Sequence, residues 1–107
     1  MTEHLGPAST PGSVVLDIGG SAGALVVYTD GVLAGAEIEI RPCGQPWRGV
    51  HTAVRPRHVA SGVRWAGVFG SLPAGRYDLR VREGPASGRG ATAQVAAGSV
   101  SEVLLPA

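Results

Sequence analysis

The chain has 107 residues, a formal net charge of +1, 44% hydrophobic residues and 16% charged residues. A chain of this length forms one ordinary domain and buries most of its apolar surface without a metal ion or a disulfide. The composition excludes an extended disordered protein, and no apolar run approaches the roughly 20 residues that a membrane helix needs. We therefore expect one globular domain that does not enter a membrane.

The start of the chain and its cysteine content predict where the protein works. Residues 1–12 mix Thr, Ser, Pro and Gly and lack the basic start and apolar run of a secretory signal peptide. They predict a flexible tail before a domain that spans residues 13–107. The single cysteine, Cys43, cannot form an internal disulfide, which fits a reducing compartment. These features together predict a cytoplasmic protein.

Short runs rich in Val and Ile alternate with 17 Gly and 8 Pro, which leave no uninterrupted window for a helix. Turns are expected at residues 19–20, 29–31, 72–75 and 97–98. Short strands at this spacing favour a sandwich or a barrel, and we expect an all-β fold with a single antiparallel β-sandwich of about seven to eight strands. The predicted strands cover residues 13–18, 24–28, 36–41, 50–55, 63–69, 77–82, 92–96 and 100–105.

Alternation of apolar and polar residues predicts which side chains form the core. It is clearest over residues 36–41, where Ala, Ile and Ile face one side and Glu37, Glu39 and Arg41 face the other. The same pattern in the later strands predicts inward positions for Val50, Thr52, Val54, Val63, Trp65, Phe69, Tyr77, Leu79 and Val81, and solvent-facing positions for Ala66 and Val68.

Two segments resemble Cna-B-like and prealbumin-like (carboxypeptidase regulatory-like) β-sandwich domains. Residues 33–40 read Leu-Ala-Gly-Ala-Glu-Ile-Glu-Ile, and residues 72–77 read Leu-Pro-Ala-Gly-Arg-Tyr, which is similar to the turn of those domains. The resemblance covers residues 23–105 and implies a closing C-terminal hairpin. A Tyr77 ring can then seat in the core while its hydroxyl reaches a partner. The chain has no Lys, so it cannot form the Lys-to-Asn or Lys-to-Asp isopeptide link of many Cna-B-like domains.

Charge is segregated along the chain. The first 39 residues carry five carboxylates and no Arg, whereas residues 41–76 carry six Arg and no carboxylate. Arg side chains bind phosphates, but a pI near 8.0 is low for a nucleic-acid-binding protein, so we expect no nucleic acid partner. We expect Glu37 and Glu39 instead to pair across strands with His51 and Arg55.

Residues 42–62 have no counterpart in the resembling domains and hold the candidate site. No nucleophile stands beside a base in a catalytic setting, so we assign no catalytic residue and no cofactor. The main hypothesis is a non-catalytic interaction module that binds a protein partner or self-associates. Its binding residues would be Trp47 as an exposed aromatic anchor, with a rim formed by Arg48, His51, Arg55, Arg57 and His58.

A second hypothesis is a small-ligand or metal-binding protein, or a minor hydrolase, that uses His51 and His58. Imidazole is a common metal ligand. Two residues seven apart on an extended strand are separated by more than about 20 Å, so a turn near Pro56 would have to bring the two rings together. The C-terminal Tyr-Arg-Gly-Ser signature of the transthyretin-like hydrolases of 5-hydroxyisourate is missing.

Overall fold

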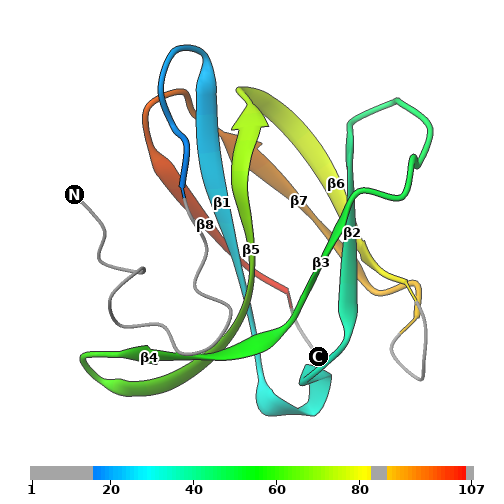
Figure 1. Cartoon of the computed structure of the whole chain (residues 1–107). Helices are drawn as coiled ribbons and strands as arrows, with labels where there is room; N and C mark the ends of the chain where they lie inside the picture. Colours follow the sequence, from blue (N-terminus) through cyan, green and yellow to red (C-terminus); the bar gives the residue numbers. More distant parts are fainter. Residues whose placement is uncertain (1–15, 83–86, 106–107) are drawn as a thin grey trace.

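The protein is a sandwich of two four-stranded sheets, as the sequence predicts (Figure 1). The computed structural model describes residues 16–82 and 87–105. The first sheet has the strand order β4-β5-β1-β8 and the second the order β3-β2-β6-β7. The strands are β1 (Ala22–Thr29), β2 (Glu37–Pro42), β3 (His51–Ala53), β4 (Arg55–Val59), β5 (Gly62–Pro73), β6 (Gly75–Val81), β7 (Gly90–Val95) and β8 (Val100–Leu104).

Helical structure in the described residues is limited to one short turn, η1 (Gly31–Leu33), which follows β1. The Asp30 side chain caps it by accepting a hydrogen bond from the Val32 amide at 3.1 Å. Within residues 16–82 and 87–105, no helix is long and apolar enough to cross a membrane.

The main core lies between the two sheets. It takes the inward side chains of both sheets, because each strand places alternate residues on one face. Ile38 is fully buried and Ile40 is 3% exposed, which confirms the inward positions predicted for these two residues. Trp65 is partly buried against this core, which agrees with its predicted inward position. Other members include Leu25, Phe69, Leu79, Val81 and Val95.

The Leu-Pro-Ala-Gly turn carries the chain from β5 in one sheet to β6 in the other. Gly75 begins β6 with φ 154°, a conformation that a residue with a side chain rarely adopts. Tyr77 is buried, and its hydroxyl donates a hydrogen bond to the carbonyl of Pro73 at 2.5 Å. The tyrosine therefore seats its ring in the core and ties the turn to the strand that follows it.

The segment 50–55 is two strands and not the single strand that we predicted. β3 pairs with β2, whereas β4 pairs with β5 in the opposite sheet. The chain changes sheets at Val54, which is 2% exposed and whose amide donates to the carbonyl of Ala36 at 2.8 Å. Val50 is 50% exposed, so its predicted inward position is wrong. The alternation of apolar and polar residues could not reveal that the chain changes sheets here. The side chain of Val54 points inward, as it would in a single continuous strand.

Part of the outer face of the first sheet is apolar and buried as well. Val26, Ala66 and Val68 form a second buried cluster, so the prediction that Ala66 and Val68 face solvent is wrong. Leu16 packs against this cluster, and residues 16–19 form no strand, which corrects the described part of the strand expected over residues 13–18. Val63 is 51% exposed and does not reach the core. Residues 13–15 and the expected tail, residues 1–12, lie outside the described residues.

The last two strands do not form the hairpin that the resemblance implies. β7 pairs antiparallel with β6, whereas β8 pairs parallel with β1 in the other sheet. The predicted turn at residues 97–98 is present, but it connects the two sheets. A parallel neighbour for β1 is possible because β8 reaches it from the opposite sheet instead of folding back on β7.

Core burial predicts a large effect at Ile38 and a small one at Val32. The Ile38→Ala variant should lower the free energy of unfolding in urea by about 2–5 kcal/mol, since it leaves a cavity between the sheets. The Val32→Ala variant should change it by less than about 0.5 kcal/mol, because Val32 is 77% exposed. Equal effects of the two substitutions would show that the space between the sheets is not the core.

Candidate functional site

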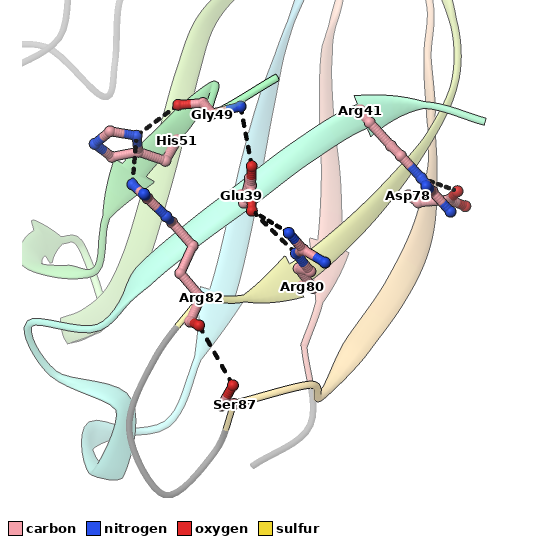
Figure 2. A network of polar contacts seen from close by, with 8 residues as sticks. All are labelled: Glu39, Arg41, Gly49, His51, Asp78, Arg80, Arg82 and Ser87. Atoms are coloured by element: carbon pink, nitrogen blue, oxygen red, sulfur yellow. Dashed lines mark hydrogen bonds and ion pairs between the residues drawn. The ribbon is translucent and has the colours of Figure 1, made fainter. Parts of the chain in front are cut away.

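Opposite charges face each other on the outer side of the second sheet (Figure 2). The β2–β6 register places Glu39 beside Arg80 and Arg41 beside Asp78. Arg80 contacts Glu39 Oε1 through Nε at 3.0 Å and Nη2 at 2.9 Å. Arg41 Nε donates to Asp78 Oδ2 at 2.9 Å. Each carboxylate therefore has a guanidinium directly across the strand pair, the arrangement that stabilises neighbouring strands.

Trp47 lies over these two arginines. The Cζ atoms of Arg41 and Arg80 are 4.4 Å and 4.0 Å from the centre of its ring, so both guanidinium groups make cation–π contacts. Trp47 is half-buried, and we predicted it as an exposed anchor for a partner. It instead fastens its own loop, residues 43–50, to the sheet.

Glu39 is the buried group beneath this loop. It is 5% exposed, which corrects its expected position on a solvent-facing strand surface. Its Oε2 accepts a hydrogen bond from the Gly49 amide at 3.0 Å, while Oε1 holds Arg80. Burial acts to raise the pKa of Glu39, but the bonds from Arg80 and Gly49 outweigh it and hold this pKa below its usual value. Glu39 is therefore a charged clasp between the loop and the sheet.

Backbone hydrogen bonds fix both ends of the loop. The Cys43 amide donates to the carbonyl of Arg76 at 3.0 Å, and the carbonyl of Val50 accepts from an amide of β2 at 2.9 Å. Gly44 and Gly49 each have φ 82°, so both reversals of the chain use a conformation that favours glycine. The loop lacks regular secondary structure, yet its course is set by contacts at its ends and in its middle.

His51 joins β3 to this network. It lies opposite Glu39 in the register, and its Nε2 is 3.5 Å from Glu37 Oε1. Its Nδ1 is 2.8 Å from the carbonyl of Gly49 and 2.9 Å from Arg82 Nη1. A neutral ring protonated at Nε2 accepts from Arg82 and points its proton at Glu37, whereas the other tautomer donates to Gly49. The expected pairing of His51 with the acidic strand is thus present.

The six predicted binding residues fall into two groups in different sheets. Trp47, Arg48 and His51 belong to the loop and β3 of the second sheet, while Arg55, Arg57 and His58 belong to β4 of the first. In the first group Arg48 and His51 are exposed to solvent, and in the second group Arg55 and His58 are exposed. Arg55 therefore does not pair with Glu37 or Glu39 across a strand, which corrects that expectation.

Arg57 is not part of an exposed rim. It is 3% exposed, and its Nε donates to the carbonyl of Ala66 at 3.4 Å. Burial, together with the positive charge of Arg55, lowers its pKa. The long apolar stem of an arginine can lie along a sheet while its head bonds a backbone carbonyl, so strand alternation does not predict exposure for this residue.

The two histidines of the alternative hypothesis lie on different sheets. His51 lies on β3 and His58 on β4, which belong to opposite sheets (Figure 1). Among residues 16–82 and 87–105, no group of three or more His, Cys, Asp or Glu side chains is placed to hold a metal ion.

Cys43 is the exposed thiol at the start of the loop. Its Sγ donates to Asp78 Oδ1 at 3.2 Å. This hydrogen bond, followed by burial and the negative charge of Asp78, raises the pKa of the thiol. The same bond and that of Arg41 lower the pKa of Asp78. Because the thiolate is the reactive form, Cys43 is held in its less nucleophilic state.

The sequence analysis missed four contributors to this surface, namely Arg41, Asp78, Arg80 and Arg82. A signal for them was present: the outward residues of 37–41 read Glu, Glu, Arg, and those of 78–82 read Asp, Arg, Arg. Run antiparallel, the two sets are complementary at Glu39–Arg80 and Arg41–Asp78. The order of the segments along the chain favours residues 50–55 as the partner of the acidic strand, because they follow it directly in sequence.

Comparisons with protein-family models, with curated proteins and with solved structures found no match for this chain. The site is therefore interpreted from its own geometry.

The buried clasp predicts a dependence of stability on pH. Since folding lowers the pKa of Glu39, its contribution is present above the unfolded-state value of about 4.3 and is lost as the pH falls through the lower folded value. In the Glu39→Gln variant the amide cannot accept the bonds from both Arg80 and Gly49. At neutral pH its free energy of unfolding should be lower than that of wild type, near the lower end of a range of about 1–3 kcal/mol, because Arg80 is partly exposed. Urea unfolding at a series of pH values should show that the difference in the free energy of unfolding between wild type and Glu39→Gln becomes smaller as the pH falls.

A matched control is Glu37→Gln on the same strand, where the carboxylate is 41% exposed. It should change stability much less at every pH. A gap between wild type and Glu39→Gln that stays constant from neutral pH to acid would contradict the assignment of Glu39 as an ionised clasp.

The thiol contact predicts a change in alkylation rate. Asp78→Asn removes the carboxylate that raises the pKa of Cys43, so this variant should react severalfold faster with iodoacetamide near pH 8. Asp17→Asn, at an exposed carboxylate away from the loop, should leave the rate unchanged. Equal rates for wild type and Asp78→Asn would mean that the aspartate does not control the thiol.

Proposed function

We propose that this domain is a non-catalytic interaction module that binds a protein partner through the loop of residues 43–50. One observation carries the proposal: Glu39 in the sheet bonds the loop, and Trp47 in the loop packs on Arg41 and Arg80, while Arg48 and Val50 remain exposed. Binding residues are commonly placed on loops that a rigid scaffold positions.

The energetics of the clasp support a binding role more than a role in stability. Burying the carboxylate of Glu39 costs desolvation energy that its attraction to the partly exposed Arg80 only partly returns, so apolar residues would stabilise a strand pair equally well. What the clasp adds is a fixed shape for an irregular loop. A loop that is already ordered loses less conformational entropy when a partner binds it, which strengthens the complex.

The exposed side chains indicate the chemistry of the partner. Val50 is 50% exposed and offers an apolar contact. Arg48 precedes it by two residues, and the carbonyl of Arg76 bonds the Cys43 amide at the start of the loop; both arginines are exposed. An apolar centre with a basic rim suits a protein surface that presents a small apolar patch bordered by carboxylates.

Two further expectations belong to the same proposal. The Leu-Pro-Ala-Gly turn, with its Tyr77 bond to Pro73, supports a relation to Cna-B-like and prealbumin-like domains. The single free thiol of Cys43 supports a cytoplasmic setting. The alternative of a ligand or metal site at His51 and His58 is less favoured, because the two residues belong to opposite sheets.

Site-specific photocrosslinking tests the loop directly. A photoreactive amino acid at Arg48 or at Val50, in cells that naturally produce the protein, should give the same discrete protein adduct from both positions. The same amino acid at Val32, which is 77% exposed, is the control and should give no such adduct. Once the adduct is identified, Arg48→Glu should weaken its binding about tenfold or more in calorimetry, since it reverses the charge of the rim.

Adducts that form equally from Val32, or none from positions 48 and 50, would refute the loop as a binding surface. Unfolding of the Arg48→Glu variant should match that of wild type, because Arg48 is exposed. This measurement separates a loss of binding from a loss of fold.

A further inference from the structure

Within residues 16–82 and 87–105 the sandwich has four edge strands, and three of them carry features that oppose pairing with another chain. An open edge presents unpaired backbone groups, and proteins protect it with short strands, proline or charge. β3 has only three residues. β4 contains Pro56 between Arg55 and Arg57. β8 carries Glu102 on its exposed surface.

β7 carries none of these protections. It has six residues, Gly-Ala-Thr-Ala-Gln-Val, without a charge or a proline. It pairs with β6 in an unbroken register from Gly90 to Val95, so no bulge twists it away. In the part of the chain that the structure describes, β7 is the last strand of its sheet. It is the edge best suited to accept a further strand.

The hydrogen-bonding pattern shows which groups of β7 face outward. The carbonyl of Arg89 accepts from the Val81 amide at 2.9 Å, so Arg89 directs its backbone towards β6. In an antiparallel pair, alternate residues point their backbone groups at the same neighbour. Residues 91, 93 and 95 therefore bond β6, and the amides and carbonyls of Gly90, Thr92 and Gln94 face the open side. All three of these residues are exposed.

We propose that β7 pairs antiparallel with β7 of a second copy of this chain, about a two-fold axis at Thr92. In this register Thr92 lies opposite its own copy, and Gly90 lies opposite Gln94 in both directions. The outward backbone groups of the three residues then all find partners. The second sheet of each copy continues into the other as one sheet of eight strands.

The composition of β7 favours a second copy over a different chain. A two-fold interface brings each residue against the same surface of its twin, so any charge on the axis would repel itself. Thr92 is neutral, and a Thr–Thr pair across two strands is favourable. Self-pairing of β4 would instead set Arg residues beside one another. The pairing uses β7 of both copies, and the other described edge strands are protected. Association therefore stops at the dimer.

This inference does not rest on the loop of residues 43–50. The loop connects β2 to β3 and packs over Arg80 of β6, whereas the proposed dimer contact uses the backbone groups on the open side of β7. Arg76 of β6 lies opposite Gln94 of β7, so the two surfaces are neighbours, but they use different groups and each is tested by its own substitution.

Charge substitution at the two-fold axis tests the register. Wild type should show a concentration-dependent monomer–dimer equilibrium in sedimentation velocity. Thr92→Lys alone and Thr92→Glu alone should each raise the dimer dissociation constant about tenfold or more, because like charges then meet at the axis. An equimolar mixture of the two variants should restore the dimer, since Lys then faces Glu.

Control substitutions and a measurement on wild type show whether a loss of the dimer comes from misfolding of a variant. Val32→Lys adds the same charge at a site 77% exposed and should leave dimerisation unchanged. Thr92 lies opposite Asp78 within the chain, so thermal unfolding of Thr92→Glu must be compared with wild type. In wild type itself, hydrogen exchange at the Thr92 and Gln94 amides should slow as protein concentration rises.

Three results would overturn the inference. They are a wild-type protein that stays monomeric at all concentrations, single variants that dimerise as wild type does, and a mixture that fails to restore the dimer. A dimer that survives at Thr92→Lys but is lost at Arg48→Glu would place self-association on the loop, which would refute the β7 interface and leave the binding role of the loop intact.

Discussion

The outer face of the second sheet depends on the buried carboxylate of Glu39. It accepts from Arg80 on β6 and from the Gly49 amide in the loop, so a single side chain joins the strand pair to the loop above it. The same guanidinium of Arg80 then faces the ring of Trp47. Without the charge on Glu39, Arg80 would lose its partner and Trp47 part of its support. The shape of the loop is therefore coupled to the ionisation of one buried group.

The core, the loop and the β7 edge lie in different parts of the sandwich. The core between the sheets supplies stability through apolar burial, because both sheets turn one face inward. The outer face of the second sheet holds the loop, and β7 forms one edge of that sheet within the described residues. A loop contact relies on side chains, whereas an edge contact relies on the main chain. The two surfaces can therefore be altered independently by substitution.

Local pattern predicted the strands better than their partners. The alternation of residues 36–41 and 77–82 identified β2 and β6 with their inward faces, since burial of one face imposes a period of two. The role of Tyr77 followed from the turn beside it. The same alternation failed at Val50 and did not reveal that the chain changes sheets at Val54, and it failed at Ala66 and Val68, where the outer face is buried too. Periodicity reports which side of a strand is apolar but not what covers the other side.

The sequence by itself determined the all-β class, the strand-rich segments and the positions of the principal turns, because these depend on residues close together in the chain. Only the tertiary structure decided that β2 meets β6, that β8 joins β1 in parallel, and that Trp47 closes over Arg41 and Arg80. Apart from the contact of Trp47 with the nearby Arg41, these contacts join residues tens of positions apart. Their formation depends on which faces of the two sheets are left to be covered after the core has been buried, and no local pattern encodes that choice.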